Sequence, residues 1–170
     1  MHRKMSVLLM AFVLPAGGAG DAALDRATLR GVKAVNVVID PVAADIQKEG
    51  ATADALRTRL EDRLREAGIA VDTAANEFVA LRLTSVRAPR GKLLANPGPF
   101  AIAATVGLYQ PVVLVRDRNI KTATQTWEVE TVALADTKQV YRACMDSVDE
   151  LAGRFVAAYR SVNGESAEKK

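Results

Sequence analysis

Two segments of the chain alternate between apolar and polar residues, which is the pattern of a half-buried β-strand. In residues 78–87 an apolar side chain recurs at every second position from Val79. In residues 122–134 Trp127 lies on one side of the chain and Glu128 on the other, and the alternation continues from there. A Val-rich run at residues 32–39 predicts a further strand that is buried on much of both faces.

Residues 100–116 predict a long strand, or two strands joined by a bulge at Gly107 or Pro111. The polar run at residues 117–121 is typical of a turn, so this strand and residues 122–134 should form a long antiparallel hairpin. Bulky side chains line one face of the strand. Small side chains and one tyrosine line the other face, namely Ala101, Ala103, Thr105, Gly107 and Tyr109.

Two segments have the spacing of amphipathic helices. In residues 52–67 Leu56, Leu60 and Leu64 recur every four residues, and Thr52 is a suitable N-cap. A second apolar stripe begins after Asp136 and extends over about five turns. Its members are Val140, Cys144, Val148, Leu151, Phe155 and Tyr159.

The order of these elements is β-α-β-β-β-α, which predicts an α+β fold. We expect one domain at residues 23–164, a four-stranded mixed sheet with both helices packed on one face, and a right-handed first crossover. Residues 88–99 hold three prolines and two glycines and predict a loop. The polar residues 165–170 predict a disordered tail.

Residues 1–22 follow the three-part pattern of a secretory signal peptide, with a basic start, an apolar middle and an exit of small residues. The apolar middle is too short to span a bilayer. Small residues precede a cut after Gly20 or after Ala22, so the mature chain should start near Asp21 or Ala23. No cysteine lies near the exit to carry a lipid. The sequence therefore predicts export to the periplasm as a soluble protein, with no membrane anchor and no lipoprotein modification.

Removal of this leader changes the chemistry of the chain. Without Arg3 and Lys4, 21 basic residues stand against 20 acidic ones, a formal net charge of +1. A domain so close to neutral lacks the electrostatic footprint of a nucleic-acid binder. His2 is the only histidine, so the mature chain has no histidine for a catalytic pair or a metal site. We therefore predict no catalytic residues, no cofactor and no metal site.

Two features keep a chemical role open. Glu128 and Glu130 project from the same strand face and could bind a hard cation or share a proton, as in a histidine-free, carboxylate-based hydrolase. A solvent-exposed strand face explains them more simply. Cys144, the only cysteine, could be a reactive thiol or an intermolecular link, but its place on an apolar helix stripe favours a buried thiol.

Three segments carry a resemblance to a known family. GLYQPVVLVRD at residues 107–117, TATQTWEVETVAL at 122–134 and FVAAYRSVN at 155–163 are similar to a family of small exported bacterial periplasmic proteins, most of them uncharacterised. The chain plan also resembles the amino-terminal domain of TolB and the auxiliary lipoprotein subunits of lipid-transport ABC systems. This resemblance implies a non-enzymatic envelope component that works through protein contacts. The sequence departs from those relatives in two ways, because it lacks the lipoprotein cysteine and a propeller after the domain.

The small-residue strand face is the candidate site, because an apolar sheet face without helices must meet something. That partner could be an envelope protein, a second copy of the chain, a lipid-like ligand or the chain's own 88–99 loop. We expect a soluble periplasmic binding or accessory module. A carboxylate-based hydrolase and a structural envelope-assembly protein are the alternatives. The residues predicted to bind a partner are Ala101, Ala103, Thr105, Gly107 and Tyr109.

Overall fold

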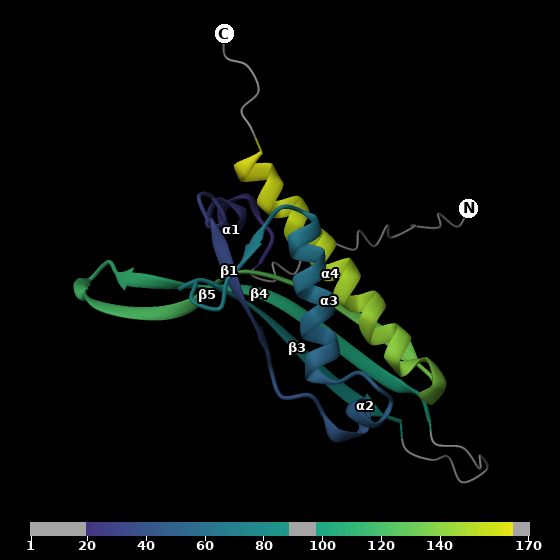
Figure 1. The fold of residues 1–170 in the computed structure, drawn as a ribbon. Helices are drawn as coiled ribbons and strands as arrows, with labels where there is room; N and C mark the ends of the chain where they lie inside the picture. The colour runs from purple at the N-terminus through teal and green to yellow at the C-terminus, as the bar shows by residue number, and fades with distance from the viewer. Residues whose placement is uncertain (1–19, 89–97, 165–170) are drawn as a thin grey trace, which may run out of the picture.

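A five-stranded mixed sheet forms the centre of the fold in the computed structural model, which describes residues 20–88 and 98–164. The strand order is β2-β1-β3-β4-β5, with β1 parallel to β2 and β3, and with β3, β4 and β5 antiparallel (Figure 1). The predicted signal peptide up to residue 19 and the predicted tail lie outside the described residues. The strands are β1 Ala34–Ile39, β2 Ala70–Val71, β3 Phe78–Arg87, β4 Phe100–Leu114 and β5 Asp117–Ala135.

Two long helices, α3 and α4, lie side by side across one face of this sheet (Figure 1). Shorter helices precede them in the chain, and a single 3₁₀ turn leads into α4. No helix within residues 20–88 and 98–164 is both long and apolar enough to cross a membrane. The helices are α1 Ala23–Ala27, α2 Ala44–Lys48, α3 Ala53–Glu66 and α4 Val140–Asn163, and the 3₁₀ turn is Thr137–Gln139.

The α+β class with a mixed sheet is confirmed, but the predicted count of four strands and two helices is wrong. The sheet has β2 as a fifth strand, and α1 and α2 are additional helices. β2 contains two residues and each extra helix contains five. Segments of that length complete at most about one and a half helical turns or one strand period, so no periodicity reveals them.

The first long helix forms as its sequence predicts. The Thr52 hydroxyl accepts a hydrogen bond from the Ala55 amide at 3.2 Å, which satisfies one of the free N–H groups at the start of α3. Its leucine stripe is fully buried. Gly68 follows the helix with φ +81°, a conformation that glycine adopts without strain.

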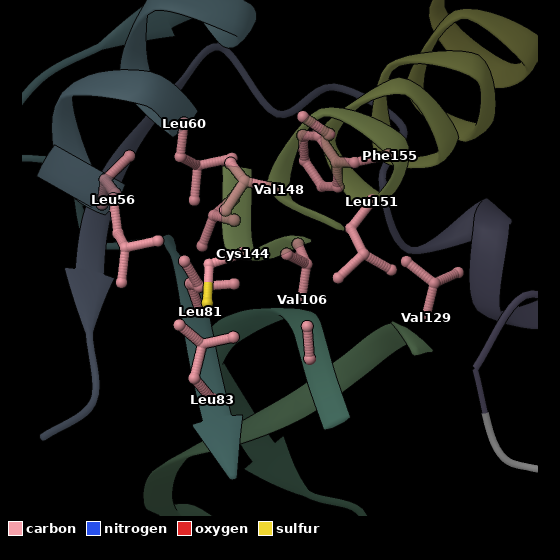
Figure 2. Close-up of a cluster of buried hydrophobic side chains, with 14 of the residues drawn as sticks. Leu56, Leu60, Leu81, Leu83, Val106, Val129, Cys144, Val148, Leu151 and Phe155 are labelled. Carbon is pink, nitrogen blue, oxygen red and sulfur yellow. The ribbon is translucent and has the colours of Figure 1, made fainter. Parts of the chain in front are cut away.

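The core lies between the two long helices and the sheet. Figure 2 shows Leu56 and Leu60 of α3 facing Leu81 of β3, with side chains of α4 beside them. Phe155 of α4 meets Trp127 of β5 edge to face, with ring centroids 5.2 Å apart. Each such large side chain stabilises the fold by about 1.5–3 kcal/mol when fully buried. The predicted α4 stripe is buried at every position except Tyr159, which is partly exposed.

The predicted hairpin of β4 and β5 is confirmed, and it carries a β-bulge. Leu108 pairs with Trp127 and Tyr109 pairs with Gln125, so Thr126 is an extra residue on β5. Beyond Tyr109, β4 pairs with β5 and no longer with β3. Residues 110–124 therefore form a two-stranded arm that projects past the rest of the sheet (Figure 1). The turn lies at residues 115–116, before the predicted position.

Candidate functional site: the helix-free face of the sheet

All five predicted contact residues lie on the sheet face opposite α3 and α4. The residues that alternate with them on β4 are fully buried under those helices. The predicted set divides into two groups. Ala101, Ala103 and Thr105 are partly exposed, whereas Gly107 is buried and Tyr109 is engaged by its neighbours.

One end of this face is aliphatic. Ala101 lies between Val86 of β3 and Leu134 of β5, which are its direct partners in the register. In the next row Ala103 lies beside Val132. The relative exposures are 67% for Val86, 68% for Val132 and 77% for Leu134. We call these five residues the aliphatic end.

The middle row of the face is charged. Thr105 of β4 lies between Arg82 of β3 and Glu130 of β5. The Arg82 guanidinium donates a hydrogen bond to the Asp40 carboxylate at 2.7 Å, and this contact raises the pKa of Arg82. Arg82 and Glu130 therefore mark the polar border of the aliphatic end.

The opposite end of the face is covered by the chain itself. The Tyr109 ring stacks on Phe78 with centroids 4.9 Å apart and planes 2° from parallel. The Tyr109 hydroxyl donates to Oε1 of Gln125 at 2.9 Å, and the Gln125 amide donates in turn to the Glu128 carboxylate. The Gln125 side chain lies over Gly107. Gly107 and Tyr109 therefore belong to an internal network and leave little surface for a partner.

The two candidate carboxylates project from the same face, as predicted, but they have different surroundings. Glu130 is exposed, whereas Glu128 is partly buried and accepts the hydrogen bond from Gln125. Glu128 also lines a depression of about 210 Å³, and Glu130 does not. The other residues that line it are Gly20, Asp25, Gln125, Thr126 and Trp127.

No group of three metal-ligating side chains gathers within the part of the chain that the structure describes. Cys144 lies in the core between α4 and the sheet (Figure 2). Burial raises the pKa of its thiol to about 11. This is the environment expected for the predicted buried thiol.

The prediction missed Val86, Val132 and Leu134, which are the most exposed members of the aliphatic end. The alternation of β3 places Val86 on the same side as Arg82. The alternation of β5 places Val132 and Leu134 on the same side as Glu130. A search for large apolar residues at the polar positions of an alternating strand would have found all three. The register then brings them together around the predicted alanines.

The chain matches no family model and no curated protein. It is similar to the solved structure of a minor lipoprotein from Acinetobacter baumannii, with 17% identity, a TM-score of 0.40, and coverage of 76% of this chain and 94% of that one. For a PelC dodecamer from Paraburkholderia phytofirmans these values are 11%, 0.43, 72% and 87%. For the rare lipoprotein B from Shewanella oneidensis they are 14%, 0.38, 75% and 94%. These values describe a distant likeness in chain path and assign no function.

Proposed function

We propose that this protein is an exported, non-enzymatic accessory module whose aliphatic end binds another protein of the cell envelope. One observation carries the proposal. Val86, Val132 and Leu134 are more than two-thirds exposed around Ala101 and Ala103, on the sheet face opposite α3 and α4. Burial of such a patch against a partner removes apolar surface from water, which favours association.

The arrangement suits a protein partner better than a small ligand. Small ligands bind in concave sites that enclose most of their surface. The depression of about 210 Å³ lies at the other end of the face, beside Glu128, and two further depressions lie along α3 and α4. An aliphatic patch bordered by Arg82 and Glu130 has instead the apolar centre and polar rim of a protein interface.

The absence of catalysis is part of the proposal. The sequence after His2 has no histidine, so a hydrolase would depend on carboxylates. Glu128 accepts a hydrogen bond from Gln125, and Glu130 is exposed outside the depression that Glu128 lines. This arrangement favours contacts over the alternative of a carboxylate-based hydrolase. A structural role in envelope assembly would use the same contact surface.

Site-specific cross-linking tests the proposal. A photoreactive amino acid replaces Val86, and the full chain is expressed in a bacterial host that contains its natural partners. We expect an adduct of defined mass, and we expect Val132→Glu to remove it. Val115→Glu is the matched control, because Val115 is 96% exposed on the projecting arm and receives the same new charge. Both variants should retain the melting temperature of the unsubstituted chain, since each side chain is exposed.

Three results would contradict the proposal. An adduct that persists with Val132→Glu would place the contact elsewhere on the chain. Loss of the adduct with Val115→Glu alone would assign the contact to the arm. An adduct with twice the mass of this chain would identify a second copy as the partner, and the module would then be a homo-oligomer.

A further inference from the structure

The beginning of the described chain is built into the edge of the sheet. The Gly20 carbonyl accepts a hydrogen bond from the Glu128 amide at 3.0 Å, so Gly20 lies beside the outer strand β5. Gly20 is buried, and a Cβ atom at this position would overlap the Glu128 carbonyl oxygen. Only glycine fits here. The hydrogen bond to β5 and the burial of Gly20 place this residue in the folded domain.

The next residue makes a second contact with β5. The buried indole of Trp127 donates to Oδ1 of Asp21 at 3.0 Å, and Arg26 holds the same carboxylate through two hydrogen bonds of 2.7 Å. A chain that starts at Ala23 would lack both Gly20 and Asp21. The buried N–H of Trp127 would then lose its partner, and an unsatisfied buried donor is destabilising.

We propose that export cleaves the bond between Ala19 and Gly20 and that the new α-ammonium of Gly20 binds Asp25. In the uncut chain the Gly20 nitrogen already donates to Oδ2 of Asp25 at 3.2 Å. Hydrolysis consumes one water molecule, breaks the C–N bond, and leaves a carboxylate on Ala19 and a protonated amine on Gly20. The hydrogen bond from a neutral amide to the Asp25 carboxylate thereby becomes an ion pair, which is stronger. Gly20, Asp25 and Glu128 line one depression, so Glu128 adds negative charge beside the amine.

The sequence before this bond fits a leader peptidase. Small residues are required one and three positions before the cut, and Ala19 and Gly17 occupy these positions. Because Gly20 is buried in the folded domain, we expect the bond to be cut before the chain folds. The cut lies one residue before the earliest start that the sequence pattern predicts, and it keeps both Gly20 and Asp21 in the mature domain.

Intact-mass measurement of the exported protein tests the cleavage site, which rests on the proposed export. The full chain is expressed with its own leader, and periplasmic and cytoplasmic fractions are analysed separately. We expect a periplasmic species that begins at Gly20. A periplasmic species that begins at Asp21 or Ala23 would overturn this inference and leave export intact. A full-length chain retained in the cytoplasm would overturn both.

Purified chains test the ion pair independently. One chain begins at Gly20, and a second carries Ala19 in front of it, so that the Gly20 nitrogen is an amide. Asp25→Asn should lower the folded-to-unfolded ratio of the first chain about tenfold more than that of the second, because only the first chain loses an ion pair. Asp62→Asn, a change on the exposed side of α3, is the control. Equal losses in the two chains would show that the ammonium does not bind Asp25.

Discussion

The indole Nε1 of Trp127 donates a hydrogen bond to Oδ1 of Asp21 at 3.0 Å, across a sequence separation of 106 residues. Trp127 is buried in the middle of β5 and packs against Phe155 of α4. Asp21 in turn binds Arg26 in α1. This contact therefore ties the first residues of the domain to the strand that the last helix covers.

We expect Asp21→Ala to destabilise the domain by about 1–3 kcal/mol, because the buried N–H of Trp127 loses its acceptor. Asp21→Asn keeps an acceptor oxygen and should cost less. Urea denaturation followed by tryptophan fluorescence measures both changes. Asp146→Ala, which removes only an exposed contact with Arg142, is the control and should have little effect. Equal stabilities of Asp21→Ala and the control would contradict the assigned role.

The Asp21 carboxyl also makes the stability of the domain depend on pH in the acidic range. Hydrogen bonds from Arg26 lower the pKa of Asp21 below its ordinary value of 3.8, Trp127 adds to this effect, and burial opposes it. A carboxyl with a lowered folded pKa stabilises fully above its unfolded pKa, and this stabilisation is lost as the pH falls through the folded pKa. The stability difference between the unsubstituted chain and Asp21→Asn should be constant above about pH 5 and shrink below 3.8. Urea titrations across this range measure it, and a difference that stays constant down to pH 3 would be inconsistent with the lowered pKa.

Cys144 should be almost inert in the native protein. With a thiol pKa of about 11, about one thiol in a thousand is ionised at pH 8, against about one in ten at the ordinary value of 9.0. Burial also blocks access to the sulfur. We expect an aromatic disulfide reagent to react at least about a hundredfold more slowly with the native chain than with the chain in urea. Cys144→Ser gives the background rate, and fast native labelling would mean that the thiol is accessible.

The elements that the sequence predicts well are those whose pattern repeats. The α3 stripe has three leucines at a spacing of four residues, the α4 stripe runs over about five turns, and β3 alternates over ten residues. Each pattern repeats often enough to distinguish a helix or strand from a chance arrangement of apolar residues. β2 was missed because a strand of two residues has no alternation to detect, and its pairing with β1 depends on the tertiary fold.

The candidate site was only partly predictable for a different reason. The alternation on β4 predicts that every second residue from Ala101 to Tyr109 lies on one face, but it does not show what covers that face. The bulge at Thr126 shifts the register of β5, so that Gln125 lies opposite Tyr109 and its side chain reaches Gly107. Without the bulge, Gln125 would point toward the helices. A single extra residue therefore removes two of the five predicted contact residues, Gly107 and Tyr109, from the available surface.

That internal network can be tested through Gly107. A Cβ atom at this position would lie 2.8 Å from Nε2 of Gln125, so Gly107→Ala must displace the Gln125 side chain. We expect a cost of about 1–2 kcal/mol. In a Gln125→Ala background the same change should cost less than about 0.5 kcal/mol, because the clash is gone. Denaturant titrations of the four chains form a double-mutant cycle, and additive costs would show that Gln125 does not cover Gly107.

The projecting arm should be dispensable for folding. Beyond Tyr109 the two strands pair only with each other, and Val113, Val115 and Ile120 are exposed on the arm.

We therefore expect that replacement of residues 112–122 by Asn-Gly, a pair that favours a tight hairpin turn between the register partners Pro111 and Ala123, leaves the fold intact. The melting temperature should change by no more than about 4 °C, since the core residues lie outside the arm. Loss of cooperative unfolding would show that the arm supports the core. If the aliphatic end is the contact surface, the shortened chain should also keep its Val86 cross-link, whereas a shortened chain that folds but loses the adduct would transfer the contact to the arm.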